Sequence, residues 1–252
     1  MSPLLVANWK MNPRTLARAQ TLFASYALKK KPRAGIVVCP PASFLPAMHA
    51  LRKKKIGLQT IALGGQNIGP ATEGAFTGNI SPSMLKEFGA GYVIIGHSEC
   101  RAQGETNELI NQKVKTALAA NLHVLLCVGE IERVHDGAEF SVIREQIAIA
   151  LDGVTKSRMK RLTICYEPVW AIGTGNPASA AEAIEVGLFI LRTIASVIGK
   201  HPRNAVRVLY GGSVNAENAR DFLEHDVISG FLVGGESLSG RSLLGILHAI
   251  TK

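Results

Sequence analysis

The sequence predicts an α/β protein with a single (β/α)₈ barrel that spans residues 1–252. Three observations predict it: eight short apolar runs follow one another, segments with helical periodicity separate most of them, and the chain has 252 residues. Alternating strands and helices build parallel sheets, and eight such units in about 250 residues match a barrel of this kind. An open doubly wound sheet is the competing arrangement. It is less favoured because no glycine-rich dinucleotide-binding fingerprint follows the first apolar run.

The eight predicted strands share a short apolar run without regular polar alternation. Strands that are buried on both faces have this pattern. The predicted strands are residues 4–7, 36–39, 56–60, 92–95, 123–128, 162–166, 206–210 and 228–234. A composition of 47% hydrophobic and 19% charged residues agrees with a large core and excludes a disordered chain.

Two of the segments between the strands predict helices most clearly. Residues 107–120 are rich in helix-forming side chains, with Asn107 as the expected N-cap. Residues 179–199 have helical periodicity, and Ser179 and Glu182 have the spacing of a capping box. The longest irregular stretch is residues 64–81. Segments of this length are usually functional or disordered, and the apolar side chains in this one argue against disorder.

The cysteine and histidine positions predict neither a disulfide framework nor a metal site. Cys39, Cys100, Cys127 and Cys165 include no C-x-x-C pair, and three of them lie in or beside apolar runs. Cysteines that act as small hydrophobic side chains are typical of a reducing compartment, so we expect a cytoplasmic protein. The seven histidines show no metal-ligand spacing, and we expect no metal and no cofactor.

A net charge of +9 first suggests a nucleic acid or another acidic surface as partner. The basic clusters are residues 29–33, 52–55, 156–161 and 200–203, and each lies between a predicted helix and a predicted strand. There, positive charge complements a helix C-terminus, and no aromatic side chains are interleaved to stack on bases. We therefore expect no nucleic-acid partner. We expect no membrane partner either, because no apolar stretch reaches the roughly 18 residues of a span and the N-terminus has no export signal.

Polar residues and glycines follow the predicted strands, where a barrel of this kind has its active site. Asn8 and Lys10 follow the first strand, His97 and Glu99 the fourth, Glu130 the fifth, Glu167 the sixth, residues 211–214 the seventh and residues 234–237 the eighth. Each alone has an ordinary explanation, such as a solvated lysine, a core histidine or a tight turn. The fold brings them to one rim, and packing alone does not explain that combination.

These residue types suit the removal of a proton next to a carbonyl group. Glu167 lies beside the apolar Val169 and Trp170, and a carboxylate in a dry site is a stronger base. His97 directly follows a strand, where a neutral imidazole can donate a hydrogen bond to a carbonyl oxygen. Glycine-rich turns offer backbone N–H groups to a phosphate, and Lys10 adds a positive charge. A base and an electrophile without a cofactor motif fit proton abstraction α to a carbonyl.

Residues 168–175 predict a lid over this site. Pro168 stiffens one end, and Gly173 and Gly175 permit backbone changes at the other. Trp170 and its apolar neighbours exclude water on closure. A dry site strengthens electrostatic interactions and protects a reactive enediolate.

Six motifs resemble those of the triosephosphate isomerases, in the same order along the chain. They are ANWKMN (7–12), IIGHSE (94–99), CVGE (127–130), YEPVWAIGTG (166–175), YGGSV (210–214) and LVGGESL (232–238). The resemblance covers essentially the whole chain. It implies a TIM barrel enzyme of glycolysis and gluconeogenesis, an isomerase that interconverts dihydroxyacetone phosphate and D-glyceraldehyde 3-phosphate.

The resemblance also implies catalytic roles for the matching residues. Glu167 would move the proton between adjacent carbons, and His97 would polarise the carbonyl oxygens. Lys10 and Asn8 would hold the substrate and the developing enediolate. Glu99 would organise Lys10 and His97.

Phosphate binding and assembly follow from the same resemblance. The phosphate would be bound by backbone N–H groups of Gly173, Ser213, Gly234 and Gly235. The family is mostly dimeric, so the resemblance implies a homodimer formed through residues 64–81. No metal is implied.

Three positions depart from the family pattern. Cys100 stands where an arginine is usual, so Glu105 loses its usual partner unless Arg101 or another donor replaces it. Asn79 stands where a glutamate is usual, in the segment expected to form the dimer. Glu236 stands where a small residue is common and adds negative charge near the expected phosphate site.

Two other functions remain open from the residues alone. One is a barrel aldolase that uses Lys10 as a Schiff-base nucleophile. The other is a non-catalytic binding protein whose basic clusters hold an acidic partner. Covalent trapping of Lys10 would identify the aldolase, and salt-sensitive association without turnover would identify the binding protein.

Overall fold

The computed structural model describes residues 1–133, 137–171, 178–198 and 206–251. Eight parallel strands form a closed barrel in which each strand pairs with the next and β8 pairs with β1. They are β1 Leu4–Asn8, β2 Gly35–Cys39, β3 Ala62–Gly65, β4 Ala90–Ile95, β5 His123–Val128, β6 Leu162–Tyr166, β7 Arg207–Tyr210 and β8 Ile228–Val233. The closed barrel confirms the predicted (β/α)₈ fold.

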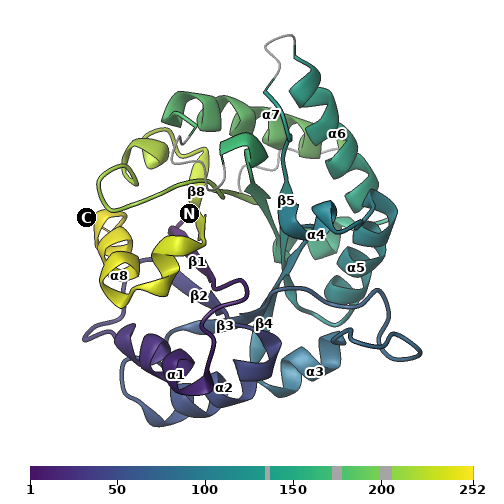
Figure 1. Ribbon diagram of the computed structural model, residues 1–252. Coiled ribbons are helices and arrows are strands. Elements are labelled where there is room, and N and C mark those ends of the chain that lie inside the picture. The colour runs from purple at the N-terminus through teal and green to yellow at the C-terminus, as the bar shows by residue number, and fades with distance from the viewer. Residues whose placement is uncertain (134–136, 172–177, 199–205, 252) are drawn as a thin grey trace.

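Helices surround the barrel, as Figure 1 shows in a view along its axis. The α-helices are α1 Leu16–Ser25, α2 Leu45–Lys54, α3 Pro82–Glu87, α4 Ser98–Ala102, α5 Asn107–Ala119, α6 Ala138–Leu151, α7 Ala180–Ile198 and α8 Gly240–Ala249. Short 3₁₀ turns are η1 Ala42–Phe44, η2 Lys156–Arg161, η3 Val169–Ala171, η5 Asp221–Leu223 and η6 Gly235–Leu238. No helix in the described parts of the chain is long and apolar enough to cross a membrane.

The strands are buried on both faces, which explains their uninterrupted apolar runs. One buried cluster consists of strand residues alone, including Val6, Cys39, Leu125, Cys165 and Leu232, and it fills the inside of the barrel. Successive strand residues alternate between faces. Because Cys165 faces inward, Glu167, two positions later, is directed to the same side at the open end.

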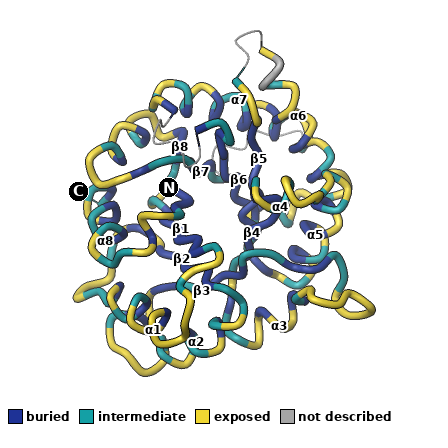
Figure 2. The backbone as a smooth tube through the Cα atoms, viewed as in Figure 1, coloured by how far each residue is buried: buried dark blue, intermediate teal, exposed yellow. Residues whose placement is uncertain are grey.

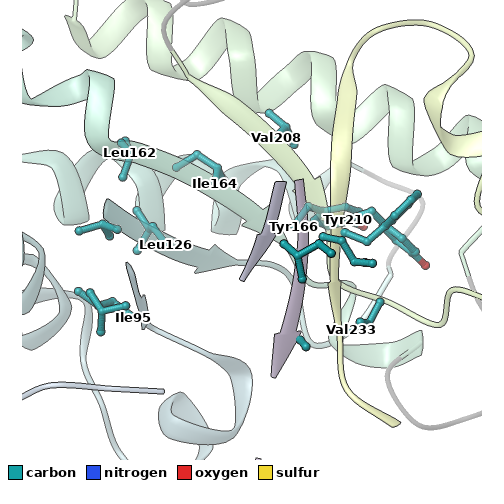
Figure 3. Close-up of a cluster of buried hydrophobic side chains, with 14 of the residues drawn as sticks. Ile95, Leu126, Leu162, Ile164, Tyr166, Val208, Tyr210 and Val233 are labelled. Atoms are coloured by element: carbon teal, nitrogen blue, oxygen red, sulfur yellow. The ribbon is translucent and has the colours of Figure 1, made fainter. Parts of the chain in front are cut away.

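The second cluster joins the outside of the barrel to the helices. Figure 3 shows part of it, with side chains from five neighbouring strands: Ile95, Leu126, Leu162, Ile164, Tyr166, Val208, Tyr210 and Val233. In Figure 2 the strands are mostly dark blue, whereas the outer helix surfaces include many exposed residues.

The predicted third strand, residues 56–60, is wrong. Those residues form turns, Ile56 is 87% exposed, and the strand is Ala62–Gly65 instead. Its sequence, ALGG, has low strand propensity. Packing requires a glycine at position 64, because a Cβ atom there would lie 2.7 Å from Cys39 Sγ.

Two predicted helices are present, with a small correction at one start. In α7, the hydroxyl of Ser179 accepts from the N–H of Glu182, and Glu182 Oε2 accepts from the N–H of Ser179, which confirms the capping box. In α5 the N-cap is Thr106, whose hydroxyl accepts from the N–H of Leu109, and not Asn107 as expected. Asn107 instead accepts a hydrogen bond from Arg101.

The irregular segment 64–81 projects beyond the ring of helices beside α3 (Figure 1). Its base is anchored by Ile68, which is 2% exposed. Residues 72–79 are exposed, and the Phe76 ring is 43% exposed on this single chain. The segment therefore does not bury Phe76 against its own barrel.

Candidate active site

A cavity of about 380 Å³ opens at the C-terminal ends of the strands. Its lining comes from both ends of the chain and from the middle: Asn8, Lys10, His97, Glu167, Gly211, Gly212, Ser213, Val214, Asn215, Asn218, Leu232, Val233, Gly234, Gly235 and Glu236. The structure thus brings together most of the residues that the sequence analysis placed at this rim. Gly173 lies outside the described residues.

Glu167 is 2% exposed and directly follows β6. Its backbone N–H donates to the carbonyl of Val128, 2.8 Å away, which extends the β5–β6 pairing by one residue. Its Oε2 accepts from the N–H of Ser98 at 2.9 Å, and its Oε1 lies 3.2 Å from His97 Nε2. A carboxylate held by two donors in a buried position is fixed in direction and separated from bulk water.

Neighbouring glycines make room for Glu167. A Cβ atom at Gly129 would overlap the carbonyl oxygen of Glu167 at 1.8 Å. A Cβ atom at Gly211 would lie 2.9 Å from Glu167 Cγ. The strand-end glycines of CVGE and YGGSV therefore have a packing function at the site.

His97 is the N-cap of α4, and its ring orientation follows from that position. Its Nδ1 accepts the backbone N–H of Glu99 at 3.2 Å. A ring nitrogen that accepts a hydrogen bond carries no proton, so in this arrangement the proton of the neutral ring is on Nε2. Nε2 lies beside Glu167 and faces the cavity.

Lys10 has a left-handed backbone conformation, with φ of 52°. Such a conformation is unfavourable for a lysine and persists only where surrounding contacts hold it. Asn8 Oδ1 accepts from the N–H of Lys10 at 3.0 Å, and Gln66 Nε2 donates to the carbonyl of Lys10 at 2.8 Å. The ammonium group is then paired with Glu99 Oε1 at 2.7 Å.

Glu99 is not among the cavity-lining residues, but it connects two of them. One carboxylate oxygen binds Lys10, and the other lies 3.8 Å from His97 Nδ1. Gln66 was missed in the sequence because it belongs to the irregular segment after β3 and reaches Lys10 only through the fold. No sequence signal identifies it.

The glycine-rich turns after β7 and β8 form a further wall of the cavity. The turn after β8 begins with Gly234 and η6. A Cβ atom at Gly234 would lie 3.3 Å from Lys10 Cε. Asn215 and Asn218 also line this wall and were not predicted. They cap each other's loop, since Asn218 Oδ1 accepts from the N–H of Asn215 at 2.9 Å.

Glu236 is exposed at the edge of this wall, and it also lines the adjoining surface hollow with Arg241. Its carboxylate therefore adds negative charge beside the turn that was expected to bind phosphate. A solvent-exposed charge is screened by water and salt, which limits this effect.

Glu130 lies outside the cavity lining, although it ends the neighbouring strand. It is 1% exposed, and its Oε1 accepts from the hydroxyl of Tyr166 at 2.9 Å and from Trp170 Nε1 at 2.8 Å. Burial and this carboxylate raise the pKa of Tyr166 well above its ordinary value. Glu130 thus fixes η3, the first turn of the segment predicted as a lid, whereas residues 172–177, with Gly173 and Gly175, lie outside the described residues.

Glu105 is paired with a lysine, because Cys100 stands at the position where the family usually has an arginine. Lys113, on α5, forms a buried ion pair with it, and Asn67 Nδ2 donates to it at 2.6 Å. Arg101 instead binds the carbonyl of Gly96 at 2.8 Å. The Cys100 thiol borders this cluster, and burial followed by the Glu105 charge raises its pKa to about 11.

The chain is similar to known proteins over nearly its whole length. Residues 3–250 match the family model described as triosephosphate isomerase. A triosephosphate isomerase of Lawsonia intracellularis is 41% identical over 253 residues, which cover 99% of this chain and 98% of that protein. Those of Roseiflexus sp. and Carboxydothermus hydrogenoformans are each 42% identical, over 98% and 97% of this chain and 97% of each relative.

Proposed function

The chain belongs to the triosephosphate isomerase family, and we propose how its cavity residues interconvert dihydroxyacetone phosphate and D-glyceraldehyde 3-phosphate. The reaction moves one proton between adjacent carbons through an enediolate, a step used in glycolysis and gluconeogenesis. The contact between Glu167 Oε1 and His97 Nε2, 3.2 Å apart in the cavity, carries the assignment of roles. This short distance supports roles as base and hydrogen-bond donor, because one small substrate can touch both side chains.

Glu167 is the base that carries the proton. It removes a proton from C1 of dihydroxyacetone phosphate, which leaves an enediolate, and returns it to C2, while the hydroxyl proton of O1 passes to O2 and C1 becomes the aldehyde. Nearly complete burial supports this role, because the carboxylate borders the cavity while it is separated from bulk water.

His97 and Lys10 stabilise the charge that the base creates. The Nε2–H of His97 donates to the carbonyl oxygens, while Nδ1 stays occupied by the N–H of Glu99. The Lys10 ammonium, oriented by Glu99 and by the amide of Asn8, faces the developing negative charge. Preorganised donors of this kind supply much of the stabilisation in enzyme active sites.

The substrate phosphate binds at the glycine-rich wall. Backbone N–H groups of Ser213, Gly234 and Gly235 serve it, and Gly173 completes the set from the segment after Glu167. Support comes from the three described residues, which line the cavity on the side of Lys10. Residues 168–175 close over the bound substrate, and at their first turn Trp170 Nε1 donates to Glu130 Oε1.

A coupled assay that follows conversion of glyceraldehyde 3-phosphate tests the function directly. Turnover by the purified protein supports the isomerase, and absence of turnover rejects it. Borohydride treatment in the presence of substrate separates the aldolase alternative, which needs a neutral amine on Lys10. Lys10 Nζ is held in an ion pair with Glu99 Oε1 at 2.7 Å, so Lys10 should remain unmodified.

We further propose a cytoplasmic homodimer in which residues 64–81 form the contact. The exposed Phe76 ring and the exposed loop residues around it support a surface that a second copy covers. The four cysteines are free thiols in the structure, three of them buried, as suits a reducing compartment. Sedimentation at micromolar concentration tests the assembly, and a fully active monomer would reject it.

A further inference from the structure

Three basic clusters lie at the end of the barrel opposite the active site. Residues 29–33 precede β2, residues 52–55 lie before β3 and residues 156–161 precede β6, each with four lysines or arginines. Because all the strands are parallel, the loops that enter them share one end of the barrel, whereas the cavity residues follow the strands. We refer to these three clusters as the basic face. The fourth cluster of the sequence, residues 200–203, lies outside the described residues.

The helix dipole accounts for only part of the basic face. Of α1, α2 and α6, only α2 has cations in its last turn, whereas residues 156–161 themselves form the short 3₁₀ turn η2, with three cations in its last turn. Helix α1 ends at Ser25, so Lys29 lies a full turn beyond it, and the dipole acts only within the terminal turn. The sequence-based explanation therefore holds for residues 52–55, extends only to a six-residue 3₁₀ turn for residues 156–161, and fails for residues 29–33.

The charges of the basic face are not neutralised within the described part of the chain. None of the ion pairs found there includes a lysine or arginine of the three clusters. Arg158 and Arg161 donate to the backbone carbonyls of Leu118 and Asn121, which fixes the guanidinium groups without cancelling their charge. The lysines of the clusters are exposed.

The distribution of the clusters favours an extended, flat anionic partner. Strands β2 and β3 are neighbours in the barrel, whereas β6 is three strands further round. A narrow ligand, such as a duplex or an acidic peptide, would reach one part of this arrangement. Ile56, directly after the second cluster, is 87% exposed, and no aromatic residue occurs in the three clusters. Cations around an exposed aliphatic side chain suit a lipid surface, whereas single-stranded nucleic acid needs stacking aromatics.

We propose that the basic face binds the surface of an anionic phospholipid bilayer. The contact is peripheral and needs no span, and it departs from the expectation from sequence, which was no membrane partner. The cytoplasmic leaflet carries the anionic lipids of a cell membrane. Bound in this way, the protein would hold its cavity away from the lipid, open to small substrates.

Co-sedimentation of the full chain with vesicles tests the proposal. We expect binding at low salt to vesicles that contain phosphatidylserine, little binding to pure phosphatidylcholine, and loss of binding as salt rises. In Lys30→Glu/Lys31→Glu the partition coefficient should fall at least about 25-fold, since each basic residue near such a surface contributes about a fivefold factor. In Ile56→Ser it should fall a few-fold, with an unchanged dependence on salt.

The matched control is Arg14→Glu/Arg18→Glu, which makes the same change in net charge at the other end of α1. It should change the partition by less than about threefold. Isomerase activity of each variant verifies that it is folded. Equal losses in the two double variants would assign the effect to net charge and overturn the proposal. Failure to bind phosphatidylserine vesicles at low salt, with or without binding to duplex DNA, would overturn it as well.

Discussion

The carboxylate of Glu167 is held so closely that a change of one bond length should be measurable. Glu167→Asp keeps the charge and withdraws it from the cavity. A misplacement of about 1 Å can cost roughly 10²-fold in rate, and we expect this loss mainly in kcat. Steady-state kinetics with glyceraldehyde 3-phosphate measure it, and a near-normal kcat would remove Glu167 from the proposed mechanism.

A substitution at Gly211 tests the position of the Glu167 carboxylate without changing a residue that reacts. In Gly211→Ala the new Cβ would lie 2.9 Å from Glu167 Cγ, so the carboxylate must shift by a few tenths of an ångström. We expect kcat to fall about tenfold with a smaller change in KM. Gly91→Ala is the control, since a Cβ there meets nothing within 4 Å. Equal kinetics of the two variants would contradict the steric argument.

At the residue scale, sequence could locate the groups that lie next to strand ends. Asn8, Lys10, His97 and Glu167 each follow an apolar run within a few residues, and the fold alone brings them to one rim. Gln66 could not be found in this way. Its contact with the Lys10 carbonyl spans 56 positions and depends on the path of an irregular segment.

At the scale of elements, α5 carries a buried cation whose removal should destabilise the fold. The side chains of Lys113 and Glu105 are 4% and 12% exposed. Lys113→Met would leave the Glu105 carboxylate buried without its cation, which typically costs about 3–5 kcal/mol. Urea unfolding at a fixed protein concentration measures the change, because oligomer stability depends on concentration.

The control for this prediction lies on the same helix. Lys115 is 43% exposed, and its Nζ is 4.0 Å from Asp152 Oδ2. An exposed pair at this distance contributes little, so Lys115→Met should change the free energy of unfolding by less than about 1 kcal/mol. If Lys113→Met is equally mild, the Glu105–Lys113 pair does not support the fold as described.

The elements themselves were predictable where burial dictated their composition. Strands β5 and β6 have the bounds expected from their apolar runs, because both faces of each strand are covered. Strand β3 was misplaced since it needs glycine at the point where Cys39 and Tyr92 approach its backbone. Its packing therefore requires glycines in place of the β-branched and aromatic residues by which a strand is recognised in sequence.

For the whole molecule, the segment 64–81 decides the proposed assembly. Phe76→Asp would place a charge in the contact of a two-fold dimer, where each defect occurs twice. We expect the variant to sediment as a monomer at micromolar concentration. Ile131→Asp is the control, because Ile131 is 75% exposed and belongs to the loop after β5, not to residues 64–81. A dimeric Phe76→Asp variant would place the contact elsewhere.

The closed barrel was predictable from sequence because its strand count and chain length leave few other arrangements. The projection of residues 72–79 could not be predicted from sequence. Their exposure in the single chain depends on where the segment leaves the barrel beside α3. The position of the basic face relative to the cavity likewise required the strand directions.

Because Trp170 donates a hydrogen bond to the buried Glu130, its intrinsic fluorescence should report on the position of this segment. The chain has two tryptophans, and Trp9 is fully buried with its Nε1 bound to the hydroxyl of Tyr26. Trp170 is half-buried, and its indole follows Glu167 by three positions. A change in intrinsic fluorescence on addition of a phosphate-bearing inhibitor would therefore originate mainly from Trp170. With Trp9→Phe as background, stopped-flow emission would time the movement of this segment in solution without any attached dye.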